Sequence, residues 1–266
     1  MTSTAWPASC TTRLTELNEA ATVELTAPGS ADLLLDVLAA DPADVHRFVD
    51  EHLAPLPEVT SVECLFATSL YTEGSRWRLG SLDPAQLSAL GRRHGGAPDA
   101  EASASAPGEV DRALLDALAH DGRLGLATLA QRLDVSAATV RRRLGRLTRS
   151  GTVAFRRDVA PELTGLPVAV TFRGRAPVRD VNTLHRTLAT LHGCRLVAAV
   201  TGTSTVLATY WLPGIGSVRQ HETAMAARLG TLEITDRIIC ARTVKRMGHL
   251  LDRAGRRAGT RPVRSW

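Results

Sequence analysis

Apolar residues recur at helical spacing three times between residues 109 and 150, and each run is short. In the third run Val140, Leu144 and Leu147 form one stripe, while arginines gather on the opposite side. Ser136 precedes this run, where its hydroxyl can accept a backbone N–H as a helix N-cap. The second and third runs, joined by a tight turn, have the order of a helix-turn-helix. The second helix of this motif enters the major groove, and here it is the third run with its basic face.

The run after Gly151 alternates in a different way. Residues 152–157 alternate apolar and polar and end on Arg156 and Arg157, which predicts a short basic strand, or wing. A lone arginine-rich helix is more often a solvated face than a DNA reader. Here the helices, the turn, the cap and the strand agree, which favours DNA binding.

The pattern changes again after residue 160. Four strands and two helices follow in the order β-α-β-β-α-β, which predicts a ferredoxin-like domain. The predicted strands cover residues 167–173, 195–200, 205–212 and 231–241, and the predicted helices cover residues 178–192 and 217–229. Thr201–Ser204 form the hairpin turn between the two central strands.

The N-terminal region repeats part of this order. Residues 22–72 can be laid on residues 195–245 without a gap, so that Gly29 falls on Gly202. The predicted elements of the first copy are strands at 22–25, 31–39 and 59–71 and a helix at 42–53, with Asp41 as its N-cap. This copy lacks a convincing first strand and helix, with residues 1–21 as a remnant. The loss would leave a sheet edge that pairing with the second copy, in the same chain or a partner, would cover.

Composition sets the domain boundaries. Residues 91–108 hold Gly, Ala, Pro and Ser and almost no large apolar residue, which predicts a linker after a helix at 84–93. The fold class is therefore α+β: a winged helix-turn-helix and a ferredoxin-like domain, preceded by a degenerate partial ferredoxin-like domain. The predicted domains are 1–90 (partial ferredoxin-like), 91–108 (linker), 109–160 (winged helix-turn-helix), 161–245 (ferredoxin-like) and 246–266 (tail).

The charge is distributed unevenly along the 266 residues. Residues 1–108 carry a net charge of −9, residues 109–160 carry +4 and residues 161–266 carry +10. The middle and C-terminal regions are therefore the ones expected to face phosphates.

Other function classes find little support in the sequence. No apolar run approaches the roughly 20 residues that a membrane span needs, and the start lacks the order of a signal peptide. The four cysteines lie far apart, so we expect free thiols in a reducing cytoplasm, with no metal site. Nucleotide-binding and hydrolase motifs are absent, and we expect no cofactor and no catalytic residues.

The residues around the predicted turn resemble a known family. Leu133-Asp134-Val135-Ser136, Arg142-Arg143-Leu144 and Gly151-Thr152-Val153 are similar to the Lrp/AsnC (leucine-responsive, feast/famine) transcription regulators. Residues 167–242 resemble that family's ligand-binding and oligomerising domain, and residues 22–72 a degenerate second copy. The chain resembles a long actinobacterial type that has two halves, and it would begin inside the first half, without the first helix-turn-helix.

The resemblance implies residue roles. Contact with double-stranded DNA is expected from the start and outer face of the third helix and from the wing: Ser136, Ala137, Ala138, Thr139, Arg141, Arg142, Arg143, Arg146, Arg149, Arg156 and Arg157. Arg143 leans toward the apolar stripe, so a structural role is as plausible for it as a phosphate contact. An effector pocket, commonly for an amino acid, is expected at Gly202, Thr203, Ser204 and Thr205. These residues replace an acidic turn and carry no carboxylate to pair with an amino group.

We therefore predict a cytoplasmic, sequence-specific transcription regulator that forms a homodimer or a higher even oligomer and reads a palindromic site. Two alternatives stay open. One is a tetrapyrrole decarboxylase of the same fold, whose cavity His185, His192 and Arg195 would line. The other is a truncated interaction protein that pairs with full-length relatives and modulates them.

Overall fold

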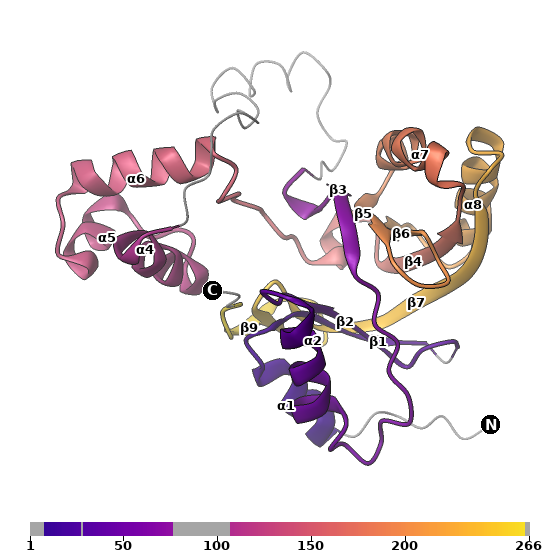
Figure 1. The fold of residues 1–266 in the computed structure, drawn as a ribbon, viewed down its shortest axis with the longest axis horizontal. Coiled ribbons are helices and arrows are strands. Elements are labelled where there is room, and N and C mark those ends of the chain that lie inside the picture. Colours follow the sequence, from indigo (N-terminus) through magenta and orange to yellow (C-terminus); the bar gives the residue numbers. More distant parts are fainter. Residues whose placement is uncertain (1–7, 28, 77–106, 264–266) are drawn as a thin grey trace. The chain divides into compact units, whose positions relative to one another are not determined.

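A computed structural model describes residues 8–27, 29–76 and 107–263 of the chain (Figure 1). The chain divides into two compact units, one of residues 1–77 and 158–266 and one of residues 78–157. The first unit contains both ferredoxin-like copies, which the sequence analysis placed in separate domains. The exact domain boundaries stay a prediction, and the predicted helix at 84–93 and most of the predicted linker lie outside the described residues.

The smaller unit is a three-helix module. Its helices are α4 (Glu109–His120), α5 (Leu126–Leu133) and α6 (Ala137–Arg149). Their apolar stripes meet in a core whose fully buried members are Leu114, Leu129, Val140 and Leu147. The core therefore takes one or two residues from each helix, as the spacing predicted.

The predicted wing is wrong. Residues 153–160 form no strand, and Phe155 is half exposed. A strand needs a neighbouring strand to accept and donate its main-chain hydrogen bonds. No strand lies elsewhere in the described part of the smaller unit, so the alternating pattern has nothing to pair with.

The second ferredoxin-like copy is complete. Its elements are β4 (Val168–Arg175), α7 (Val178–Thr190), β5 (Cys194–Val200), β6 (Val206–Leu212), α8 (Ser217–Arg228) and β7 (Glu233–Arg246), preceded by the short helix η3 (Pro161–Thr164). The strand order is β7-β4-β6-β5, and all neighbours are antiparallel. Both helices cover one face, where Val170, Phe172, Leu188, Val197 and Tyr210 form the centre of the core. This confirms the predicted β-α-β-β-α-β order.

The first copy holds more than the sequence analysis expected. Its elements are α1 (Ala8–Glu16), β1 (Ala20–Thr26), β2 (Leu33–Val37), α2 (Pro42–Phe48) with the π turn η1 (Val49–Leu53), β3 (Ala67–Thr72) and the short helix η2 (Gly74–Arg76). The first helix, which was predicted to be lost, is present as α1 and buries Leu14 in the core of this copy. Asp41 caps α2 as predicted, because its carboxylate accepts the N–H of Asp44 at 2.9 Å.

The two copies exchange strands within one chain. The second half of β7 pairs with β1, and β3 pairs with β5, so that the sheet order is β2-β1-β7-β4-β6-β5-β3. In Figure 1, β7 runs from its place beside β4 to the strands of the first copy. The predicted pairing of the two copies within one chain is thus confirmed, but it does not cover the edge next to the missing first strand, because β2 stands at the end of the strand order with β1 as its neighbour.

The exchange is symmetric in register. Val23 pairs with Lys245 on one side, and Val197 pairs with Thr72 on the other. The five pairs between β1 and β2 likewise correspond to the five between β5 and β6, with an irregularity at the same place. The strands β2 and β3 match β6 and β7 at the predicted offset of 173, whereas β1 matches β5 at 174. The turn after β1 is therefore one residue longer than the turn after β5, and the gapless alignment is wrong by this one residue.

The predicted C-terminal tail is partly ordered as strands. β8 (His249–Leu251) pairs with the end of β7, and β9 (Arg257–Thr260) pairs with β8. Met247 and Gly248 make the turn with positive φ, and the N–H of Gly248 donates to the carbonyl of Ala21. The tail therefore extends the sheet beside the first copy.

Candidate nucleic-acid interface

The tight turn between α5 and α6 fixes the direction of α6. Asp134 ends α5 in the left-handed region at φ 50°, a conformation that Asp adopts more easily than most residues. Ser136 then caps α6, because its hydroxyl accepts the N–H of Thr139 at 3.1 Å. The predicted N-cap is thus confirmed, and the hydroxyl of Thr139 lies 2.9 Å from the same oxygen.

A buried carboxylate holds α6 against α4. Asp111 has a side chain only 3% exposed, and it forms ion pairs with Arg143, at 3.1 Å, and Arg146. Its other partner is the N–H of Gly108, which it caps at 3.2 Å. Burial on its own would raise the pKa of Asp111, but the hydrogen bonds from Arg143 and Gly108 and the charge of Arg146 together hold it below its ordinary value. Asp111 is therefore ionised near neutral pH and positions two of the α6 arginines.

The residues predicted to contact DNA divide into two groups. Six side chains are exposed on the start and outer side of α6: Ser136, Ala137, Ala138, Arg141, Arg142 and Arg149. Thr139, Arg143 and Arg146 are half-buried, the last two through Asp111. The exposed group presents the guanidinium groups of Arg141, Arg142 and Arg149 to solvent, on the side of α6 away from the core.

The segment that follows α6 contributes less than a wing would. Arg157 is exposed, whereas Arg156 is half-buried with its Nε atom enclosed. Without a strand, neither side chain has a fixed direction set by a sheet. Their role as backbone contacts stays a prediction.

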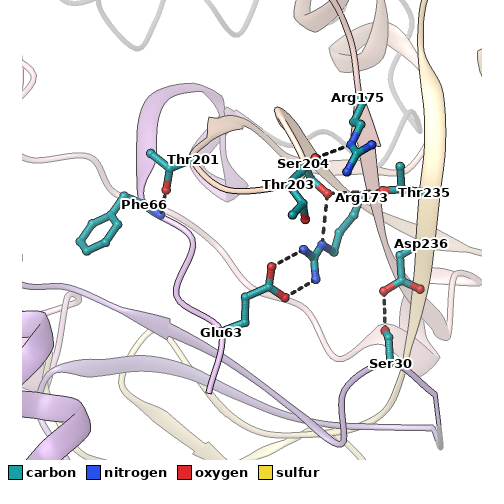
Figure 2. A network of polar contacts seen from close by, with 10 residues as sticks. All are labelled: Ser30, Glu63, Phe66, Arg173, Arg175, Thr201, Thr203, Ser204, Thr235 and Asp236. Carbon is teal, nitrogen blue, oxygen red and sulfur yellow. Dashed lines mark hydrogen bonds and ion pairs between the residues drawn. The ribbon is translucent and has the colours of Figure 1, made fainter. Parts of the chain in front are cut away.

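The predicted effector turn is tied into the protein. Figure 2 shows the polar network that surrounds it. The buried Ser204 accepts from Nε of Arg173 at 3.4 Å, and the hydroxyl of Thr205 accepts the N–H of Ala176 at 2.9 Å. Gly202 has φ +96°, and an added Cβ would lie 3.0 Å from Leu65. Glycine is therefore required there by the turn itself.

A carboxylate lies beside this turn although the turn contains none. Glu63, from the first copy, accepts two hydrogen bonds from Arg173 at 2.7 and 2.6 Å (Figure 2). The hydrogen bond and charge of Arg173 lower the pKa of Glu63 despite the opposing effect of burial. At the equivalent place in the other half, Ser30 donates to Asp236. The acidic group that the turn lacks in sequence is thus supplied across the contact of the two copies.

Sequence reasoning missed both Asp111 and Glu63 as parts of these sites. Asp111 carried a signal, because an acid at the third position of a helix is typical of an N-terminal cap. Glu63 carried none, since its partner is 110 residues away in sequence. Only the pairing of the two copies brings it to Arg173.

Two of the residues proposed for an enzyme cavity, His185 and Arg195, are engaged in contacts with other side chains. His185 stacks on Tyr71 with ring centroids 3.4 Å apart. Arg195 is buried, pairs with Asp158 at 2.7 Å and lies over the ring of Trp211. These contacts stabilise the sheet unit and leave no observation that favours the decarboxylase.

Family models match two parts of the chain. The model of the AsnC-type helix-turn-helix domain matches residues 109–148, and that of the Lrp/AsnC ligand binding domain matches residues 2–77. The second match falls on the first copy, whose likeness the sequence analysis took as the weaker one. An uncharacterized HTH-type transcriptional regulator from Pyrococcus abyssi is 25% identical over 142 residues, which is 53% of this chain and 89% of that protein.

Solved structures are similar over about half of the chain. AsnC of E. coli shares 20% identity over 51% of this chain and 92% of its own, with a TM-score of 0.45. An AsnC family transcriptional regulator from Agrobacterium tumefaciens shares 19% identity over 54% of this chain and 95% of its own, with a TM-score of 0.47. In the described part of the chain, no helix is long and apolar enough to cross a membrane.

Proposed function

The chain belongs to the Lrp/AsnC family of transcriptional regulators, and from this premise we propose that α6 is the helix with which it reads double-stranded DNA. The single observation that carries the proposal is the division of the α6 arginines. Arg143 and Arg146 are bound to the buried Asp111, whereas Arg141 and Arg142 are exposed at the N-terminal part of the helix. Base contacts from a helix-turn-helix come from the N-terminal residues of its second helix.

The exposed side chains suit different parts of a duplex. Arg142 and Arg141 have the planar forks that bind guanine in the major groove or adjacent phosphates. Arg149 is the last residue of α6, and Arg157 follows the helix. Both suit contacts with the phosphate backbone, and such contacts fix the position of the protein on DNA without reading its sequence. The small side chains of Ala137 and Ala138 let the start of α6 approach the base edges closely.

Two chains would bind one site in this proposal. The described residues include one helix-turn-helix, so a palindromic site calls for a second chain. The internal pairing of the two copies uses the strands β1, β3, β5 and β7 within a single chain. A homodimer would therefore associate through other surfaces than these strand contacts, and the protein would act in the cytoplasm, where DNA is accessible to it in a prokaryotic cell.

An effector is proposed to act through the network of Figure 2. The amino acid would insert into the ion pair between Arg173 and Glu63. Its ammonium group would bind the carboxylate of Glu63, and its carboxylate would bind the guanidinium group of Arg173. This would loosen the contact between the two copies. If each common amino acid leaves both the DNA affinity and the thermal midpoint unchanged, this part of the proposal is wrong.

The main test is a binding titration of Arg142→Ala against a salt series, on operator fragments selected from genomic DNA. We expect a loss of about 1–3 kcal/mol of binding free energy on the best sequence and a smaller preference over random DNA. The matched control is Arg112→Ala, which removes one exposed charge from α4 of the same module. The control should weaken binding equally for all sequences or not at all. An unchanged sequence preference in Arg142→Ala would overturn the assignment of α6.

A further inference from the structure

The positive charge of the chain is not explained by the helix-turn-helix alone. Residues 109–160 carry a net charge of +4, whereas residues 161–266 carry +10. Within the latter, residues 247–263 contain four arginines and a single acid, Asp252. A short segment of the sheet unit therefore has a density of positive charge that the proposed reading of DNA by α6 does not use.

This segment contains the β8–β9 hairpin, and its one acid shapes the hairpin tip. The two strands pair antiparallel, and the tip consists of residues 252–256. The N–H of Asp252 donates to the carbonyl of Arg256 at 2.9 Å and closes the tip. The carboxylate of Asp252 accepts the N–H groups of Ala254 and Arg256, each at 2.9 Å. The acid thus binds the main chain and fixes the positions from which the arginines of the tip project.

Three exposed arginines surround this tip. Arg253 and Arg256 lie in it, and Arg257 is the first residue of β9. Other exposed arginines of the sheet unit are neutralised by acids, as Arg237 is by Glu222. Among the residues that the structure describes, no carboxylate forms an ion pair with Arg253 or Arg256. The tip therefore presents positive charge to solvent rather than to the protein.

The tip packs at the place where the chain enters the sheet unit. A Cβ added at Gly255 would lie 3.2 Å from Cδ of Pro161, so the two backbones are close neighbours. The entering segment is anchored as well by Asp158, whose carboxylate pairs with the buried Arg195 at 2.7 Å. Residues 158–161 follow directly on the unit that contains the helix-turn-helix. The basic tip is thus fixed against the segment that joins the sheet unit to the DNA-binding unit.

We propose that the tip of the β8–β9 hairpin is a second contact surface for duplex DNA, where Arg253, Arg256 and Arg257 bind the phosphate backbone. The inference rests on the proposed function, because the ligand is the same duplex. A guanidinium group binds phosphate through two parallel N–H donors. The paired strands give these groups a fixed base, which the predicted wing at residues 152–157 lacks. Such contacts add affinity and fix position but read no sequence.

Duplex DNA fits this surface better than the other polyanions of a cell. Besides its arginines and Asp252, the tip contains only Ala254 and Gly255, so it has no large apolar side chain to insert into a lipid surface. Single-stranded nucleic acid is bound largely by stacking of bases on aromatic side chains. Residues 247–263 contain no Phe, Tyr or Trp. Charge without apolar or aromatic groups is suited to the regular phosphates of a duplex.

The test is a salt series with the full chain, on the selected operator fragment and on random duplex. Arg253→Ala combined with Arg256→Ala removes two phosphate contacts, so affinity for both duplexes should fall about tenfold at about 0.1 M salt. The slope of log K against log salt should become shallower by about 1.8. The preference for the operator should stay unchanged, whereas Arg142→Ala should reduce it. Arg253→Lys combined with Arg256→Lys keeps the charges and should keep most of the slope.

The matched control is Arg186→Ala combined with Arg228→Ala, which removes two exposed charges from α7 and α8. This pair should leave the slope unchanged. A wild-type slope in the hairpin variant, or an equal loss in both pairs, would overturn the inference, while the preference for the operator would still support α6. A chain that binds no duplex at all would overturn both proposals. Binding to phosphatidylserine vesicles that the hairpin variant loses, with its DNA affinity unchanged, would assign the surface to a membrane instead.

Discussion

The two contacts between the ferredoxin-like copies have the same register of main-chain hydrogen bonds, but their side chains differ. In the contact of β1 with β7, Glu24 is buried and pairs with Arg246, and Lys245 is buried beside them. In the equivalent contact of β5 with β3, Ala198 stands in place of Glu24 and pairs with the exposed Leu70. The same register therefore tolerates a buried charged contact in one half and an apolar one in the other. The difference teaches that strand pairing here is specified by pattern and turn length more than by residue identity.

The second copy has all six of its predicted helices and strands, whereas the first copy does not, and the two cores differ in which residues form them. The buried residues of the second core all come from residues 170–229, whereas the core of the first copy borrows Val244 from β7. The second copy should therefore fold without the first, and the first should depend on the second.

The largest effect is expected from a charge placed at equivalent core positions. Val197→Asp should abolish folding of the sheet unit, and Val23→Asp should unfold only the first copy; both residues are fully buried. An uncompensated buried carboxylate costs more than about 4 kcal/mol at such sites. Hydrogen exchange measured segment by segment checks this. If Val23→Asp exposes β4–β7 as fully as α1 and β1, the two copies fold as one, and the comparison fails.

A smaller effect is expected where the two copies make the same hydrogen bond with different residues. The carbonyl of Gly193 accepts the N–H of Trp211, and the carbonyl of Glu19 accepts the N–H of Leu38. Gly193 has φ +78°, and an added Cβ would lie 2.0 Å from the carbonyl oxygen of Trp211. Gly193→Ala should lower the free energy of unfolding by about 3 kcal/mol. Glu19→Ala, at an exposed position without positive φ, serves as the control and should change it by less than about 0.5 kcal/mol. Similar losses of unfolding free energy in both variants would show that the clash of the added Cβ with Trp211 does not cause the loss.

The smallest effect concerns the buried Lys245, whose equivalent in the other contact is the uncharged Thr72. Burial lowers the pKa of Lys245 to about 8, and the nearby Glu16 and Glu19 only partly oppose this. Between that value and its ordinary value of 10.5, the unfolded chain binds a proton that the folded chain lacks. The free energy of unfolding should therefore rise with pH across this window, by about 1–3 kcal/mol.

The measurement is a set of denaturant curves at pH 7.5, 8.5 and 9.5 on the wild type and on Lys245→Met. The variant removes the titrating group, so the rise should be absent from it and present in the difference between the two proteins. A difference that does not change with pH would mean that Lys245 keeps its proton in the folded state.

Sequence reasoning succeeded where structure depends on near neighbours. The stripe of Val140 and Leu147 and the cap at Ser136 fixed α6, because helix period and capping are local. It failed where the structure of a segment depends on a neighbouring strand that is distant in sequence. Residues 59–66 have the composition of a strand, yet only β3 forms, since a strand needs a neighbour. The wing at 152–157 failed for the same reason.

The candidate site was predictable only in outline. The placement of arginines on α6 followed from the helical period, but the period says nothing about which of them a buried acid would bind. Asp111 lies 32 residues before Arg143, and only the packing of α4 on α6 joins them. The contacts of the exposed arginines with DNA stay a prediction.

The length of β7 has a consequence for how the chain can vary. The first part of its 14 residues pairs with β4 of the second copy, and the last part pairs with β1 of the first copy. An inserted or deleted residue near its middle would invert every inward and outward position of one half relative to the other. The turn after β1 holds one residue more than the turn after β5, so a change of length there leaves the pairing of both halves with β7 intact.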